Sequence, residues 1–244
     1  MSDLIIPDMS LCAIVRDEKM NPAGGIVDYV DSVMPFVEEG IIYDTGSLDG
    51  TRELLEEMQG KYPNLKVFDT PFRGFSNARN KSVKKAKTKY ALVLDADERI
   101  IKDDFGILAG EIKKTQEAGY NLNIQHMGFY GNTHGHGGHN PRVFDRTRGF
   151  KFKKKVWEFL YDSDGKKVTN TSSAKNLEEV YLYHFLPDVD AREEKGKGWY
   201  EQIMKTGAFL PFRGVGAPSQ MPGFENWKKR SPIRDDFIFG AQAV

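Results

Sequence analysis

Residues 95–98 have side chains of the kind that can bind a divalent cation. They read Asp95-Ala96-Asp97-Glu98 and directly follow the apolar run at residues 90–94. Two carboxylates two residues apart at the end of a strand can face the same way. Carboxylate oxygens suit Mg²⁺ or Mn²⁺, which usually share their other positions with water and substrate phosphates. Asp95 and Asp97 therefore predict a metal site in which the ion neutralises charge on a diphosphate leaving group.

More acidic side chains follow two earlier apolar runs. Asp17 and Glu18 come after residues 11–15, and Asp44 comes after residues 41–43. In open α/β sheets, ligands bind beyond the carboxyl ends of the strands. Three such acidic ends predict one rim that binds a polar ligand through its hydroxyls and a metal. The bare Asp-x-Asp pattern is common on solvent-exposed surfaces, but the strand before it and the glutamate after it favour a metal site.

The elements that would position these acids alternate along the first 118 residues. We expect strands at 11–15, 41–43, 65–68 and 90–94, and helices at 26–37, 51–59, 77–88 and 104–117. Ser76 is the expected N-cap of the third helix. Alternation of this kind predicts an α/β fold, with a mostly parallel sheet and helices on both faces.

The second half has a different pattern. After Gly119 we expect strands at 120–127, 141–145, 150–160 and 180–185, which complete the site. From about Arg213 the chain is rich in proline and glycine and predicts an extended arm. The prediction is one domain over residues 1–212, with halves at 1–118 and 119–212, followed by an arm at 213–244.

Composition excludes several classes of function. Lys plus Arg total 35 and Asp plus Glu total 35, so no global field attracts nucleic acid. Cys12 is the only cysteine, which excludes an intramolecular disulfide and a cysteine-rich zinc site and predicts a buried thiol. Without a signal peptide or an apolar run of about 20 residues, a soluble, cytoplasmic protein is expected. The basic run at residues 153–155 predicts a solvated face, or else contact with an anionic acceptor or a membrane surface.

Several segments together resemble the family 2 glycosyltransferases of GT-A fold. In the first hundred residues they are 14–18 (IVRDE), 44–51 (DTGSLDGT), 77–80 (NARN) and 94–98 (LDADE). Farther on, 140–144 (NPRVF) resembles the family's Arg-bearing strand, and Tyr183-His184 resembles a late His element. Residues 156–158 (VWE) resemble a Val-His-Glu segment, with Trp157 where histidine is usual.

This resemblance implies an inverting transfer from a nucleotide sugar, preferably a UDP-sugar, to a carbohydrate or glycoconjugate acceptor. Glu158 would be the general base that takes the proton of the acceptor hydroxyl. The Mn²⁺ or Mg²⁺ ion would be held by Asp97, Asp95 and His184. The donor would lie against Ile14, Val15, Arg16, Asp17, Glu18, Asp44, Asn77, Arg79, Asn80, Asp95, Ala96 and Arg142.

Plainer roles stay open for some of these residues. Asp49 is expected to organise a turn, Arg79 can be a solvated helix residue, His184 a core histidine and Glu158 a surface glutamate. Three histidines at residues 134–139 fit either a loop that closes over the donor or an adventitious zinc site.

Other classes of protein fit the sequence less well. A nucleotidyltransferase acting on sugar phosphates would need a glycine-rich, basic loop where residues 16–18 stand. A dinucleotide-binding dehydrogenase would need Gly-x-Gly-x-x-Gly there. An aspartyl phosphohydrolase would need Thr or Val at the position of Arg99. A non-catalytic carbohydrate-binding relative would keep the fold, but the intact Asp97 and Glu158 weigh against it.

Overall fold

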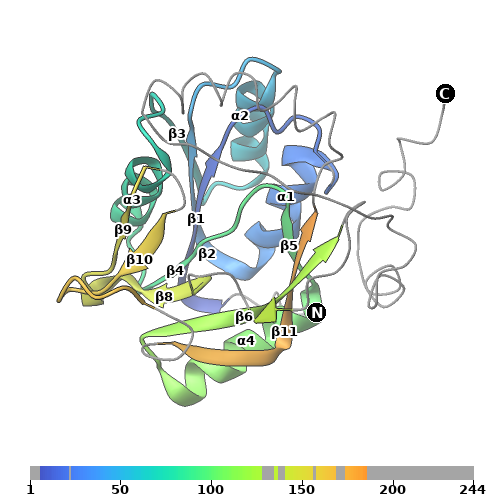
Figure 1. Ribbon diagram of the computed structural model, residues 1–244. Coiled ribbons are helices and arrows are strands. Elements are labelled where there is room, and N and C mark those ends of the chain that lie inside the picture. Colours follow the sequence, from blue (N-terminus) through green and yellow to red (C-terminus); the bar gives the residue numbers. More distant parts are fainter. Residues whose placement is uncertain are drawn as a thin grey trace.

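The computed structural model describes residues 6–21, 23–127, 135–136, 141–155, 158–168 and 174–185. Within these residues one large sheet has the strand order β3-β2-β1-β4-β8-β6-β11-β5, with β7 paired to β6 (Figure 1). A separate two-stranded sheet joins β9 and β10. The expected arm at 213–244 lies outside the described residues. No helix in the described part is long and apolar enough to cross a bilayer.

The predicted parallel half is confirmed. Its elements are β1 (Ile6–Val15), α1 (Gly25–Val33), β2 (Val37–Asp44), α2 (Thr51–Lys61), β3 (Leu65–Asp69), α3 (Phe75–Lys85) and β4 (Tyr90–Leu92). β2 and β4 both pair with β1 in parallel, and β3 pairs with β2 in parallel. Val15 is in register with Asp44, and Asp44 with Asp69, so these strands end at one level. Loops that follow them therefore meet at the same rim.

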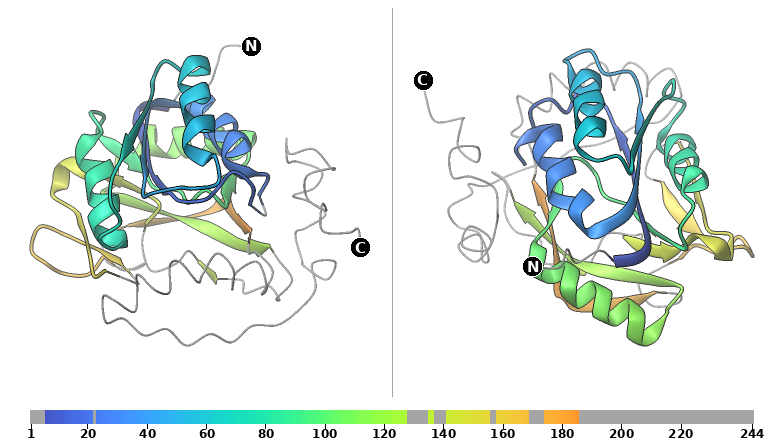
Figure 2. Two further views of the ribbon diagram at one scale, coloured as in Figure 1. Left: turned by 90° about the horizontal axis from the view of Figure 1, so that it is seen from above. Right: turned by 180° about the vertical axis from the view of Figure 1, so that it is seen from behind.

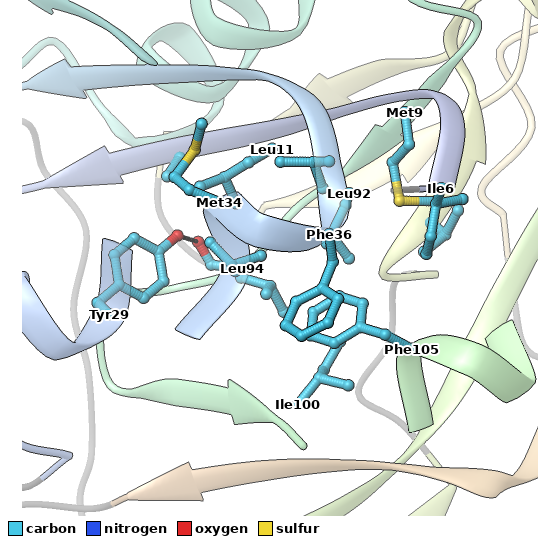
Figure 3. Close-up of a cluster of buried hydrophobic side chains, with 14 of the residues drawn as sticks. Ile6, Met9, Leu11, Tyr29, Met34, Phe36, Leu92, Leu94, Ile100 and Phe105 are labelled. Carbon is cyan, nitrogen blue, oxygen red and sulfur yellow. Dashed lines mark hydrogen bonds between the residues drawn. The ribbon is translucent and has the colours of Figure 1, made fainter. Parts of the chain in front are cut away.

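Alternation along the strands sends side chains into two cores. Leu11, Ala13 and Val15 of β1 join the core that also includes residues of α1, α2 and α4, whereas Cys12 joins the core under α3. The two further views show α1 and α2 on one side of the sheet and α3 on the other (Figure 2). In the first core the rings of Phe36 and Phe105 stack with centroids 4.3 Å apart (Figure 3). Helices thus cover both faces, as period-two strands in a two-sided sheet require.

After β4 the chain adds the helix α4 (Lys102–Thr115) and mostly short strands. The strands are β5 (Glu98–Ile100), β6 (Gly119–Met127), β7 (Gly135–His136), β8 (Val143–Asp145), β9 (Lys151–Lys153), β10 (Phe159–Tyr161) and β11 (Lys175–Phe185). β8 runs antiparallel to β4 and β6, and β5 runs antiparallel to β11. The sheet therefore changes from parallel to mixed beyond β4.

Three predicted elements need correction. The helix expected at 77–88 spans Phe75–Lys85, with Gly74 at its N-cap, so Ser76 lies inside the first turn and caps nothing. The helix expected at 26–37 ends at Val33, and a 3₁₀ turn at Met34–Phe36 leads directly into β2. The single strand expected at 150–160 is a pair of strands, because Lys154 takes a left-handed φ of 77° that no strand continues through.

Burial makes Cys12 unreactive. Its thiol is enclosed by the core under α3, and this burial raises its pKa to about 12, although a hydrogen bond with Ser82 opposes the shift. At pH 8 only about one thiol in ten thousand would be the nucleophilic thiolate. We expect native protein to react with a thiol reagent at least about a hundredfold more slowly than protein unfolded in guanidinium, as followed by absorbance. Equal rates in both conditions would contradict the buried position.

Candidate active site

Main-chain contacts from several elements hold the loop that follows β4. The hydroxyl of Tyr29 donates to the carbonyl of Leu94 at 2.9 Å (Figure 3), and the amide N–H of Phe185 donates to the carbonyl of Asp97 at 2.8 Å. The carbonyl of Ala96 accepts from the Asn21 side chain at 3.0 Å and from Arg99 at 2.8 Å. The loop is therefore fixed through its backbone, which leaves the carboxylates of residues 95 and 97 to make other contacts.

The guanidinium of Arg99 joins this loop to the start of α1. It donates to the carbonyls of Ala23 and Gly25 as well as those of Ala96 and Glu98. Burial lowers its pKa to about 10, since the surrounding partners are mostly neutral carbonyls. In the sequence, Arg99 argued only against an aspartyl phosphohydrolase. A cation directly after an acidic loop is the signal that could have indicated its structural role.

Arg79 brings the candidate base and the first aspartate together. Its Nη2 donates to Asp95 Oδ1 at 2.7 Å, and its Nε donates to Glu158 Oε1 at 2.6 Å. Burial lowers the pKa of a guanidinium, but here the two carboxylates outweigh burial and raise the pKa of Arg79. Its Nη1 is buried and has no hydrogen-bond partner among the described residues. Arg79 is thus not a solvated helix residue, and an unpaired buried donor of this kind favours an anionic ligand.

Asp97, in the loop after β4, and His184, on β11, lie close to each other. His184 Nε2, on β11, lies 3.6 Å from Asp97 Oδ2, and both side chains are about one-quarter exposed. Burial disfavours the charged imidazole, but Asp97 and Glu98 outweigh burial and raise the pKa of His184 above its usual 6.5. His184 therefore contacts the acidic loop and is not an isolated core histidine.

These groups fit a divalent ion that is shared with a substrate. The described residues contain no group of three or more acidic, histidine or cysteine side chains placed to hold an ion by themselves. Mg²⁺ and similar ions are usually held by one or two carboxylates and by substrate phosphates. Asp97 and His184 offer one carboxylate and one imidazole at the rim, whereas Asp95 Oδ1 is engaged by Arg79. The pair is suited to a site that a diphosphate completes.

Glu98 and Arg142 form an ion pair that is hydrogen-bonded to the backbone of the loop after β4. Glu98 is fully buried, its Oε2 accepts from the backbone N–H of Asp95 at 2.9 Å, and its Oε1 accepts from Arg142. Burial raises the pKa of Glu98, although Arg142 opposes the shift. The structure thus places Arg142 against Glu98, and its predicted contact with the donor stays a prediction. The sequence showed Glu98 after the aspartates, but only the fold shows what it contacts.

The loops after β1 and β2 are tied together beside this site. Asp17 takes a left-handed φ of 53°, its N–H donates to Ser47 Oγ at 2.9 Å, and its Oδ1 accepts from the N–H of Leu48 at 2.7 Å. Asp44 Oδ1 accepts from the N–H groups of Gly46 and Ser47, while its buried Oδ2 has no hydrogen-bond partner in the described part of the chain. A strained loop residue and an unpaired buried acceptor at one rim both favour a ligand site.

Other predicted donor residues lie at or near this rim. Ile14 and Val15 end β1, Arg16 Nε lies 3.6 Å from Asp17 Oδ2, and the N–H of Glu18 donates to Thr51 Oγ1 at 2.7 Å. Their contacts with a donor remain predictions. Asp49 organises the turn before α2, as predicted, since its carboxylate accepts from the N–H groups of Thr51 and Lys19.

Two residues of α3 that were predicted to contact the donor differ in their surroundings. Asn77 is exposed. The amide of Asn80 bonds both ways with the backbone of Phe152, at 2.8 and 2.9 Å, so this side chain ties α3 to β9. The side chains of the histidine loop at 134–139, and the segment Val156-Trp157, lie outside the described residues.

Parts of this sequence match a family model and the sequences of known proteins. A family model described as glycosyl transferase family 2 matches residues 24–170, more than half of the chain. A TPR repeat-containing protein of Synechococcus elongatus is 33% identical over 114 residues, which is 47% of this chain and 26% of that protein. The chain spans about a quarter or less of the curated relatives it matches.

Solved structures share the fold. Residues 1–349 of S. aureus TarS in complex with UDP-GlcNAc match with a TM-score of 0.56 and 16% identity, covering 74% of this chain and 59% of that one. The mannosyltransferase PcManGT of Pyrobaculum calidifontis, in complex with GDP-Man and Mn²⁺, matches with a TM-score of 0.53 and 15% identity, covering 84% and 66%. These likenesses confirm the GT-A architecture expected from the sequence.

Proposed function

Because this chain belongs to glycosyl transferase family 2, we propose that it transfers a sugar from a UDP-sugar to an acceptor hydroxyl, with inversion and with a divalent ion. The observation that carries the proposal is Arg79, which joins Asp95 of the acidic loop to Glu158 at 2.7 and 2.6 Å. A group that binds the leaving diphosphate and a group that activates the acceptor must lie on opposite sides of one reacting carbon. Arg79 contacts both of the carboxylates to which the proposal gives these two roles.

The donor nucleotide would lie along the rim formed after β1, β2 and β4. Asp44 Oδ2, buried without a described partner, would accept from the uracil or the ribose. The unpaired Nη1 of Arg79 would donate to the diphosphate. Nucleotide sugars bound to TarS and to PcManGT support a donor of this class. Uridine is preferred because of the family resemblance and the UDP-GlcNAc bound to TarS.

A divalent ion, Mn²⁺ or Mg²⁺, would be held by Asp97 and His184 and by the diphosphate itself. When bound, the ion would neutralise the negative charge that develops on the leaving diphosphate. Asp95, which is bonded to Arg79, would contact either the ribose of the donor or a water molecule bound to the ion. The Mn²⁺ in the complex of PcManGT supports a metal in a fold of this kind.

Glu158 would act on the acceptor. Its side chain is 13% exposed, and one carboxylate oxygen is fixed by Arg79 Nε. A fixed carboxylate beside the donor is suited to take the proton of an acceptor hydroxyl as that oxygen attacks the anomeric carbon. A single displacement of this type inverts the anomeric centre, and no covalent intermediate forms on the protein.

Thermal unfolding with nucleotides tests the donor site. With Mn²⁺ present, UDP at about 100 times its Kd stabilises by about 2.7 kcal/mol, which raises Tm by roughly 5–10 °C for a chain of this size. Without metal the same concentration of UDP is expected to raise Tm far less. NAD and inorganic phosphate, each with Mn²⁺, are the controls, and equal stabilisation by either would contradict the proposal. A larger Tm shift with GDP than with UDP would indicate that the donor carries guanosine and not uridine.

A further inference from the structure

The β9–β10 hairpin has one buried face and one face of lysines and aromatic rings. Phe152 and Leu160 are in register and pack into the core under α3. Because side chains alternate along a strand, the neighbours of these two residues point the other way. Lys151, Lys153, Phe159 and Tyr161 therefore point outward. Together with Lys154 and Lys167, whose ammonium groups lie over the Phe159 ring, they form the set that we call the lysine–aromatic face.

Ammonium groups of this face lie over its rings. Lys167 Nζ is 3.4 Å and Lys154 Nζ is 4.9 Å from the centre of the Phe159 ring, and Lys153 Nζ is 4.6 Å from the centre of the Tyr161 ring. Cation–π contacts of this type hold the lysine stems against the rings. Two ammonium groups therefore share the Phe159 ring, and together they present two positive charges to an anion.

The four lysines of the face form no ion pair in the described part of the chain, although the adjoining turn contains Asp162 and Asp164. Within the described residues, none of its four lysines has a carboxylate oxygen within 4.0 Å, whereas Lys61, Lys66 and Lys175 elsewhere each pair with an acid. The chain as a whole is neutral, with 35 basic and 35 acidic residues. This concentration of lysines is consequently local and does not reflect a basic protein.

The face is built onto the helix that carries Arg79. The N–H of Phe75 donates to the carbonyl of Lys155 at 2.8 Å, and Asn80 bonds both ways with the backbone of Phe152. A Cβ at Gly74, whose φ is 108°, would lie 3.0 Å from Lys155 Cα, so only glycine allows this close approach without strain. Glu158 directly precedes Phe159, and Figure 1 shows β9 and β10 beside α3. In the sequence, the face therefore begins one residue after the candidate base, whose own side chain contacts Arg79 on α3.

We infer that the lysine–aromatic face binds the acceptor, and that the acceptor is an anionic glycan carrying phosphate or carboxylate groups. The inference rests on the proposed function, since it assumes that Glu158 acts on the acceptor. Ammonium groups pair with phosphate or carboxylate oxygens, and the flat faces of Phe159 and Tyr161 can pack on the apolar side of a sugar ring. Nucleic acid suits the lysines too, but a neutral chain with a patch of this size lacks the wider field that such a partner needs.

Calorimetric titration of the full chain, without donor, tests this inference with two matched probes. Phosphorylated mannopentaose is expected to bind about tenfold more tightly than mannopentaose itself, and this preference should weaken as salt is raised. The double variant Lys153→Gln with Lys167→Gln keeps a polar side chain of similar length at each position but removes two charges. It should lose most of the preference, since two exposed ion pairs each contribute roughly a factor of two to five. Binding of the neutral probe should not change.

Lys102→Gln with Lys113→Gln, two exposed lysines of α4, is the matched control and should keep the preference. Equal preference in the lysine-face variant, or none in the unchanged protein, would overturn the inference. Equally tight binding of a thymidine pentanucleotide or of phosphatidylglycerol vesicles would replace the glycan by a nucleic acid or a membrane and also overturn it. UDP with Mn²⁺ is tested on the same samples. Failure there with an intact glycan preference would count against the proposed transfer but not against this site.

Discussion

Glu158→Gln is expected to lower the rate of sugar transfer by about 10²–10⁴-fold while leaving the binding of UDP with Mn²⁺ unchanged. Glutamine has the shape of glutamate, and its oxygen can still accept from Arg79 Nε, which lies 2.6 Å from Glu158 Oε1. Arg79 also keeps its bond to Asp95. The donor site therefore persists, and the loss falls on the step that needs a proton acceptor.

Two measurements separate these effects. Initial rates with saturating donor and acceptor report transfer, and the Tm shift with UDP and Mn²⁺ reports donor binding. Glu57→Gln, an exposed glutamate of α2, is the matched control and should be normal in both. A normal rate of transfer by Glu158→Gln would show that Glu158 is not the general base. Loss of both transfer and UDP binding would instead assign it a role in positioning Arg79.

The parallel half of the fold was predictable because its strands contain short, mostly apolar runs that are followed by polar residues. Burial on both faces of a sheet demands this pattern, and the register that joins Val15, Asp44 and Asp69 follows from parallel pairing. The convergence of the acidic ends is a consequence of that topology, so Asp44, Asp95 and Asp97 could be placed at one rim from sequence alone.

The rest depended on contacts between distant residues. β5 has only three residues, and it becomes a strand because β11 pairs with it, which no local pattern indicates. Glu98 looks like one more acid of a metal loop, yet its fully buried carboxylate joins Arg142 to the backbone of Asp95. Similarly, a left-handed φ at Lys154 divides a strand-like sequence, and the next residue, Lys155, packs closely against Gly74.

Asp97→Ala is expected to abolish the part of UDP binding that depends on metal and to lower transfer by at least about a hundredfold. The backbone of the loop should stay in place, because Phe185 and Arg99 hold it through the carbonyls of Asp97 and Ala96. The Tm shift with UDP should become the same with and without Mn²⁺. Asp103→Asn, an exposed acid of α4, is the control and should retain the metal-dependent shift.

The pH dependence distinguishes a lost metal ligand from a lost ion pair. Asp97 holds the pKa of His184 above 6.5, so without metal their pairing stabilises the fold below pH 6.5 and is lost as the pH rises through the raised pKa. Asp97→Ala should therefore lower the metal-free Tm more at pH 5.5 than at pH 9. Metal binding has the opposite trend, because only the neutral imidazole is a ligand and protons compete with the ion. If Asp97 served only as the partner of His184, the variant would lose stability at low pH and keep the Mn²⁺-dependent response to UDP at pH 8.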